Sequence, residues 1–539
     1  MHEPVVIPRP TRLERTAGSV DLDSATALVC PVAAQPIAML LRSLLSPATG
    51  FPLPDATSST RGGSGRAGDG TDVEIEIEID PSLGRLGPEG YRLVVETTGV
   101  TLSSSSLAGL ANACQTLRQL FDPAIFRRAP GRVATWSLPC VVVEDSPAFA
   151  WRGAHLDVAR HFFPAHFVSR FIDLIALHKL NVLHLHLTDD QGWRFPSATY
   201  PLLTEIGSWR AESMLGHARS GLFDGTPHGG AYTRSELVDL VAYAAARNVT
   251  IVPEIDLPGH TQAAIAAYPS LGNLDEPIEV WTRWGVSEHV LNTSDAALDF
   301  CRTILGEVLD VFPGSYIHVG GDECPKTEWS TSSSARKRIA ELGLSSEEEL
   351  QGWFTAQLGA FLTDNERRLV GWDEILEGGP LPDGATVMSW RGTRGGLAAA
   401  RAGFDVVMCP EAPCYFDHYQ SDDPQEPLAI HGRNTLADVY GYDPVPDDLG
   451  KDAAHHVLGS QFELWTEYLP RPEDVEYMAF PRAAALAEVV WSGPGGDLAT
   501  FERNLAIHLA RLDELGVNYR PPAGPHPWQR GGQGARRRP

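Results

Sequence analysis

Apolar and polar residues follow two different patterns along the chain, and the change lies near residue 150. Before it, residues 72–80 alternate strictly between charged and aliphatic side chains, and residues 91–96 alternate in a similar way. Alternation of period two predicts half-buried strands. Residues 107–120 carry apolar side chains at helical spacing, which predicts an amphipathic helix. Residues 1–145 are therefore predicted to form a small α+β accessory domain.

Three further segments bound the domains. Residues 58–69 are rich in Gly, Ser and Arg and predict a flexible surface loop. Residues 139–147 begin and end with proline and predict the domain connection. The chain closes at residues 521–539, which include an Arg-Arg-Arg run and predict a disordered tail.

From residue 151 onwards, short apolar runs are separated by helical stretches. This succession is typical of βα units and a parallel sheet. Eight such runs favour an α/β fold of the (β/α)8 TIM barrel type over an open, doubly wound sheet, with the barrel over residues 146–520. The predicted strands are 153–158, 181–188, 249–255, 315–320, 368–372, 386–390, 405–409 and 457–462.

Composition narrows the class of protein. A chain of 539 residues is longer than one hydrophobic core normally supports, so at least two domains are expected. Its 43 Lys and Arg against 69 Asp and Glu give a net charge of −26, which argues against nucleic-acid or membrane binding. Seven scattered cysteines predict reduced thiols, and the first ten residues do not resemble a signal peptide, so a cytoplasmic enzyme is expected. No apolar run reaches transmembrane length.

The most informative segment is residues 315–325, where an apolar strand ends in Gly320-Gly321 and then Asp322-Glu323. Adjacent side chains of a regular strand point to opposite faces, so both carboxylates can enter one pocket only if the strand stops there. Chemistry on a glycosidic bond requires a protonated carboxyl group and an ionised one. A solvated acidic turn is the alternative.

The ends of the other strands also supply polar or aromatic groups, as expected at the catalytic rim of a barrel. Arg160 with Asp189, and Asp417 with Glu467, are candidates for gripping sugar hydroxyls, although a structural salt bridge is as good an explanation of the first pair. Tryptophans at three strand ends would cover the apolar face of a sugar, with core packing as the alternative. The remaining candidates are His260, Trp372, Trp390, Tyr415 and Trp465.

Two alternative functions remain open. The first is a metal-dependent barrel hydrolase, because His184 and His186 lie on one face of a strand as its metal ligands would. However, no later strand ends in a further His ligand. Cys409 and Cys414 lack a second close pair for zinc, so neither a metal nor a cofactor is predicted. The second rival is a non-catalytic carbohydrate-binding barrel, which would have no use for a buried acid.

Several blocks of sequence, in order, resemble the β-N-acetylhexosaminidases of glycoside hydrolase family 20. The resemblance covers about residues 70–515. It includes Gly90-Tyr91-Arg92-Leu93 and Gln115-Thr116-Leu117 in the first domain. The barrel blocks are residues 156–163, 184–194, 253–260 and 318–323.

The resemblance implies an exo-acting, retaining enzyme that removes terminal β-linked N-acetylglucosamine or N-acetylgalactosamine from an oligosaccharide or glycoconjugate. The 2-acetamido oxygen of the substrate would attack the anomeric carbon and form an oxazolinium ion. Asp322 would orient the acetamido group, and Glu323 would be the general acid and base. Arg160 and Glu467 would bind ring hydroxyls, and Tyr415 would hydrogen-bond the acetamido carbonyl, with Asp417 assisting nearby. The three tryptophans would enclose the acetyl group.

The chain departs from the family pattern in places. Residues 411–456 show no clear helix, so the seventh crossover of the barrel is expected to be missing or replaced. The loop over residues 191–232 is long, and such a loop sets which aglycone fits. Most family members are exported or lysosomal, whereas no export signal is recognised here.

Overall fold

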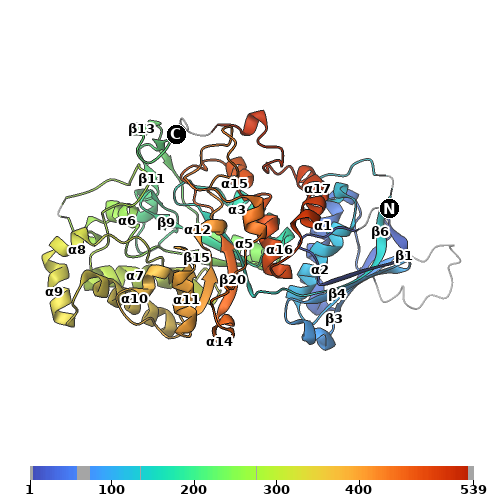
Figure 1. The fold of residues 1–539 in the computed structure, drawn as a ribbon, viewed down its shortest axis with the longest axis horizontal. Helices are drawn as coiled ribbons and strands as arrows, with labels where there is room; N and C mark the ends of the chain where they lie inside the picture. Colours follow the sequence, from blue (N-terminus) through green and yellow to red (C-terminus); the bar gives the residue numbers. More distant parts are fainter. Residues whose placement is uncertain (1–3, 57–72, 134, 275, 532–539) are drawn as a thin grey trace.

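The N-terminal domain is a mixed sheet covered by helices. The computed structural model describes residues 4–56, 73–133, 135–274 and 276–531. Six strands lie in the order β1-β6-β4-β5-β3-β2. The helices α1 and α2 lie on the side of the sheet that faces the barrel helices α16 and α17 (Figure 1). The bounds are β1 (Arg12–Leu22), β2 (Ala27–Val29), α1 (Gln35–Thr49), β3 (Glu74–Ile79), β4 (Tyr91–Glu96), β5 (Gly99–Ser104), α2 (Leu107–Leu120) and β6 (Trp136–Asp145).

The alternation of the sequence determines which face of β3 is buried. Ile75 and Ile77 are buried, while the glutamates between them stay partly exposed. Helix α2 begins at the predicted residue because the Ser106 hydroxyl accepts a hydrogen bond from the Gly109 amide and caps it. The prediction of a domain connection at 139–147 is wrong for residues 139–145, which belong to β6 and pair with β1 and β4. The predicted loop at 58–69 lies outside the described residues.

The second domain is a closed barrel of eight parallel strands, in the order β15-β16-β17-β18-β19-β20-β7-β8. The predicted TIM barrel preceded by a small domain is confirmed, and each predicted strand is present within a few residues. The strands are β7 (Trp151–Asp157), β8 (Val182–His186), β15 (Thr250–Glu254), β16 (Tyr316–His318), β17 (Arg368–Trp372), β18 (Thr386–Ser389), β19 (Asp405–Met408) and β20 (Val457–Phe462).

Helices surround the barrel, but not evenly. A 3-10 turn at residues 373–376 follows β17, and three short helices, α12 (Glu411–Cys414), α13 (Leu436–Tyr440) and α14 (Lys451–Ala454), replace a long helix after β19. The long loop over 191–232 forms short two-stranded pairs. Among the described residues, no helix is both long and apolar enough to span a membrane. The other main helices are α3 (Ala165–Leu177), α5 (Arg234–Ala245), α6 (Gln262–Ala267), α7 (Asp295–Leu309), α8 (Thr327–Thr331), α9 (Ser333–Leu342), α10 (Glu347–Asp364), α11 (Arg394–Arg401), α15 (Pro472–Ala479), α16 (Arg482–Ser492) and α17 (Leu498–Glu514).

The two domains are joined by buried polar contacts. Lys179 of the barrel and Asp145 at the end of β6 form an ion pair of 2.8 Å in which both side chains are fully buried. The indole of Trp491 and the phenol of Tyr91 also donate to this carboxylate. Loss of any one partner would leave a buried charged or polar group unpaired and would destabilise the protein.

The C-terminal segment packs against the barrel. The Gln529 amide donates to the side chain of Asn518 and to the carbonyl of Tyr519, and the Leu428 amide donates to the carbonyl of Gly531. The predicted disordered tail therefore does not begin at residue 521, because Gln529 and Gly531 form these hydrogen bonds. Residues 532–539 lie outside the described residues.

Candidate active site

The two adjacent carboxylates lie where β16 stops. After His318 the backbone leaves the extended region, with φ of +67° at Gly320 and +99° at Gly321. A Cβ at Gly320 would collide with the Asp256 carboxylate, so only glycine fits there. Glu323 itself has a φ of +45°, an unfavourable value for a side-chain-bearing residue. This local strain brings both carboxylates to one pocket.

That pocket is a cavity of about 130 Å³ at the carboxyl ends of the strands. All but two of the predicted site residues line it. Asp189 and His260 lie behind this lining and contact the residues that form it. The lining residues are Arg160, Asp322, Glu323, Trp372, Trp390, Glu411, Tyr415, Asp417, His418, Ile430, His431, Trp465 and Glu467.

His260 connects both catalytic candidates to a buried aspartate. Its Nε2 lies 3.6 Å from a carboxylate oxygen of Asp322 and 3.6 Å from one of Glu323. Its Nδ1 lies 3.2 Å from Asp189 Oδ1. Burial alone would lower the pKa of His260, but the charge of Asp189 and hydrogen bonds outweigh burial and raise it well above its ordinary value. The ring is therefore an imidazolium between the carboxylates.

The Asp189 carboxylate also forms an ion pair of 2.7 Å with the Arg160 guanidinium. The pKa of Asp189 is lowered because the charges of Arg160 and His260 outweigh the effect of burial. The predicted salt bridge is thus present. Arg160 still lines the pocket, and its guanidinium lies 4.9 Å from the centre of the Trp465 ring. Asp189 acts on the pocket through Arg160 and His260, and Arg160 itself is available to a ligand.

The two adjacent carboxyl groups differ in their electrostatics. Burial raises the pKa of Asp322 to about 6. The charges of Glu254 and Glu323 also raise this pKa, whereas the charge of His260 lowers it. Burial also acts to raise the pKa of Glu323, but the hydrogen bond and charge of His260 outweigh it, and the pKa lies below its ordinary value. Without a ligand, Asp322 therefore takes up a proton at a higher pH than Glu323 does.

Tryptophan and tyrosine rings form the wall. The centres of the Trp372 and Trp465 rings are 5.8 Å apart, and Trp390 stacks on Tyr415 at 6.2 Å. The indole of Trp390 donates a hydrogen bond of 2.9 Å to Glu374. Core packing was the alternative role for these tryptophans. Trp372 fits it partly, because this side chain is only 1% exposed, but Trp372 also lines the cavity.

Two acidic residues of the pocket have carboxylate oxygens without a partner in the described chain. Both oxygens of Asp417 and one of Glu467 are buried and unbonded. Burial raises the pKa of both groups, and the charge of Glu467 adds to the effect on Asp417. Buried acceptors of this kind cost free energy until a donor arrives. Ligand hydroxyls are suitable donors.

A layer of buried histidines lies below the pocket. The barrel register pairs Glu254 with His186 on one side and with His318 on the other. The Glu254 carboxylate accepts from the Trp372 indole at 2.9 Å and contacts His184 at 3.1 Å and His318 at 2.9 Å. Glu254 therefore holds Trp372 in place from beneath.

His184 and His186 do lie on one face, as their alternation predicted. Both contact Glu254, both are fully buried, and neither lines the pocket. A metal-dependent hydrolase would need these rings at the substrate, so their position does not favour that alternative.

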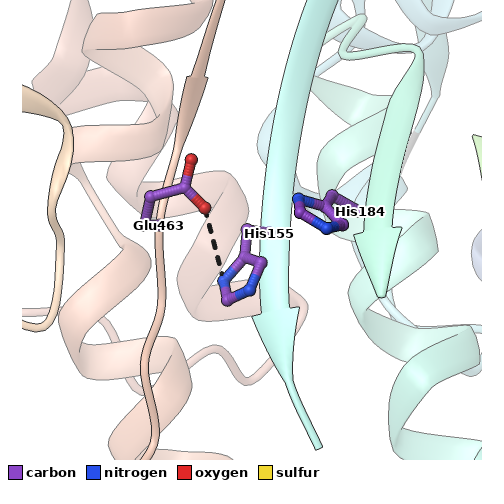
Figure 2. A group of neighbouring side chains, drawn as sticks. All are labelled: His155, His184 and Glu463. Atoms are coloured by element: carbon purple, nitrogen blue, oxygen red, sulfur yellow. Dashed lines mark ion pairs between the residues drawn. The ribbon is translucent and has the colours of Figure 1, made fainter. Parts of the chain in front are cut away.

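Figure 2 shows His155 of β7 between Glu463, which follows β20, and His184 of β8. His155 Nδ1 lies 3.4 Å from a Glu463 oxygen and accepts a hydrogen bond from the Leu464 amide. Burial raises the pKa of Glu463 to about 8. Burial lowers the pKa of His155 well below its ordinary value, and the charge of His184 lowers it further. The contact is therefore between two neutral groups.

Three acidic residues that lie at or just after the ends of β15 and β17 are absent from the predicted site. Glu254 holds Trp372, Glu374 holds Trp390, and Asp256 accepts from the Gly321 amide beside Asp322. Burial raises the pKa of Glu374 to about 8, with the charge of Asp322 adding to it. The available signal was position alone, because partners across the barrel depend on register.

Comparison with known proteins extends this description. Residues 149–494 match the family model "Glycosyl hydrolase family 20, catalytic domain", and residues 3–146 match "Glycosyl hydrolase family 20, domain 2". A β-hexosaminidase of Porphyromonas gingivalis is 40% identical over 526 residues, which are 97% of this chain and 65% of that protein. The chain thus spans about two thirds of that relative's length.

Two solved structures share the fold. A family 20 β-N-acetylhexosaminidase of Streptomyces coelicolor has a TM-score of 0.81 at 31% identity, over 96% of this chain and 98% of that one. An exo-β-N-acetylglucosaminidase of Vibrio harveyi, solved with N-acetylglucosamine, has a TM-score of 0.82 at 31% identity. It matches over 97% of this chain and 80% of that one.

Proposed function

The chain belongs to glycosyl hydrolase family 20, and on this premise we propose that it is an exo-acting, retaining β-N-acetylhexosaminidase. It removes terminal non-reducing β-linked N-acetylglucosamine or N-acetylgalactosamine from an oligosaccharide or glycoconjugate. The observation that carries the proposal is the pair Asp322 and Glu323, bridged by His260 and facing a cavity of about 130 Å³ walled by tryptophans.

Asp322 positions the nucleophile, which belongs to the substrate. Its carboxylate accepts a hydrogen bond from the acetamido N–H, so that the acetamido oxygen can attack the anomeric carbon and form the oxazolinium ion. Burial raises the pKa of Tyr415 well above its ordinary value, so its phenol stays protonated and can donate to the acetamido carbonyl. The rings of Trp372, Trp390 and Trp465 restrict the acetyl group to this geometry.

Glu323 supplies the proton. Its side chain is 42% exposed in the free protein, so a bound sugar covers it and raises its pKa. The acetamido N–H favours the ionised form of Asp322 at the same time, which reverses the proton order of the free pocket. Glu323 then protonates the leaving oxygen and later deprotonates the water that opens the oxazolinium ion.

The remaining polar groups recognise hydroxyls. Arg160, Asp417 and Glu467 all line the cavity, and the last two carry unbonded carboxylate oxygens. Hydroxyl donors of a sugar satisfy them, which makes binding specific for a polyol. We also propose that the protein works in the reducing cytoplasm, since all seven cysteines are unpaired and six of them are buried.

Binding of a thiazoline mimic of the cyclic intermediate tests the proposal directly. The mimic should bind wild-type protein at least about a hundredfold more tightly than N-acetylglucosamine, as an analogue of a high-energy state does. Asp322→Asn should lose most of this preference, whereas Asp405→Asn, a control outside the pocket, should keep it. Equal affinities for mimic and sugar in the wild type would overturn the proposal.

A further inference from the structure

The wall of the sugar pocket carries a second group of potential ligands that hydrolysis does not use. Glu411, His418 and His431 line the same cavity as Asp322 and Glu323. One ligand atom from each of the three lies within 4.8 Å of the other two. The two imidazole rings lie against each other, with centres 4.9 Å apart.

His418 is a buried side chain with an unsatisfied nitrogen. It is 5% exposed, and its Nε2 has no hydrogen-bond partner in the described chain. Its Nδ1 lies 3.4 Å from the side-chain nitrogen of Asn434. However, that amide has only two hydrogens, which go to the carbonyls of Glu411 and Tyr415 at 2.7 and 2.8 Å. The ring therefore lacks good partners, and a cation bound by the cluster would supply one.

The backbone that carries the two histidines is held firmly. The buried guanidinium of Arg482 donates to the carbonyl of Asn434 at 2.8 Å and to that of His418 at 3.2 Å. Gly432 has a φ of +65°, and a Cβ there would collide with the His418 imidazole. Glycine thus lets the His431 segment approach His418. A fixed backbone lowers the entropy that the ligands lose when they bind a metal.

We propose that Glu411, His418 and His431 form a binding site for a divalent transition metal of the zinc class. Two imidazoles and one carboxylate are a known donor set for zinc, with the fourth position left to water. Tetrahedral bonds of about 2.1 Å place donor atoms about 3.4 Å apart. Since the present donor atoms lie within 4.8 Å of one another, movement of up to about 1.4 Å by the exposed His431 and the half-buried Glu411 closes the cluster to this size.

The location gives the site a consequence. The metal and its water would occupy the wall of a cavity of only about 130 Å³, into which the terminal sugar must also fit. Metal and sugar therefore oppose each other's binding. By linkage the metal weakens sugar binding by the same factor as the sugar weakens metal binding.

Calorimetric titration of zinc chloride into the full chain tests the site without reference to activity. Wild type should bind one zinc ion, and saturating N-acetylglucosamine should weaken that binding. His431→Ala and Glu411→Gln should each weaken it at least about tenfold. His166→Ala, which removes an exposed histidine at the start of α3, should bind zinc as the wild type does. Equal zinc affinity in wild type and His431→Ala, or no saturable binding at all, would overturn the proposal.

Kinetics with and without zinc give the second test. Zinc should raise KM with little change in kcat in the wild type and in His166→Ala, and should have no such effect on His431→Ala. The metal-free kcat and KM of each variant serve as its own baseline for the effect of zinc. Zinc inhibition that persists in His431→Ala would place the ion elsewhere and contradict the assignment. Failure of the hydrolytic proposal would leave the calorimetric result unaffected, so the two failures can be told apart.

Discussion

At the scale of single residues, one imidazolium serves two carboxylates that need different protonation states. His260 lies 3.6 Å from both Asp322 and Glu323, and it stabilises the ionised form of each. In the proposed mechanism, the proton on Glu323 therefore depends on bound sugar, because burial by the sugar opposes the effect of His260.

Replacing His260 with asparagine should move the pH profile of kcat/KM to higher pH. The imidazolium lowers the pKa of both carboxyl groups, so its loss raises both. The productive, singly protonated pair is populated between the pKa of Glu323, which lies below its ordinary value, and that of Asp322, about 6, so both limbs of the profile should shift upward. His289→Asn, on a histidine paired with Glu328 at 2.7 Å outside the pocket, should leave the profile unchanged. A downward shift in His260→Asn would contradict this role.

Replacing Glu323 with glutamine should separate substrates by leaving group. For alkyl and sugar leaving groups, kcat/KM should fall about a hundred- to ten-thousandfold, the size of a general-acid contribution. For activated phenols the fall in kcat/KM should be much smaller, since these groups depart without a proton. Glutamine keeps the shape of the side chain, so folding is preserved. Equal losses on both kinds of substrate would remove Glu323 from this role.

At the scale of elements, the barrel strands hold the pocket from below. Glu254 fixes Trp372, and the histidines around it fill the barrel interior. The contact between His155 and Glu463 is part of this layer (Figure 2). Because Glu463 is buried as a neutral acid, the layer makes folding dependent on pH.

Replacing Glu463 with glutamine should raise the melting temperature more at pH 7.5 than at pH 5. The folded-state pKa of about 8 lies above the ordinary value of 4.5, so the folded state holds a proton that the unfolded state has lost between these values. Wild type therefore loses stability as pH rises through this window, by an order of 1 kcal/mol or more, and the neutral amide does not. Glu514→Gln, where Arg127 lowers the pKa, should show no such gain. A gain that is independent of pH would argue that Glu463 is ionised in the fold.

The elements were predicted from sequence more fully than the contacts between them. Helix α2 and strand β4 were predicted to the residue because a strong period and a clear boundary mark them. Strand β1 was not predicted, and residues 139–145 were assigned to a linker, because prolines obscured strand β6. The pocket residues were predicted from strand ends and family resemblance. The roles of Glu254, Asp256 and Glu374 could not be predicted from sequence, because they depend on which strands are neighbours in the closed barrel.

At the scale of the whole molecule, the accessory domain and the barrel share a buried charge pair. Lys179→Met should destabilise the protein by about 3–5 kcal/mol, because it leaves the Asp145 carboxylate buried without its cation. Thermal unfolding measures this loss, and the double variant Lys179→Met with Asp145→Asn should recover part of it. Rates at 25 °C should stay close to wild type, since the pair lies outside the pocket. Full stability in Lys179→Met would mean that the pair contributes nothing to domain docking.

In the proposed mechanism, the 2-acetamido group of the substrate is the nucleophile. The most direct measurement compares kcat/KM for para-nitrophenyl N-acetyl-β-glucosaminide with that for the matching β-glucoside, which differs only at the 2-position. We expect a ratio of at least about a thousandfold in favour of the N-acetyl substrate, because the glucoside lacks the positioned nucleophile. Comparable values for the two substrates would contradict it.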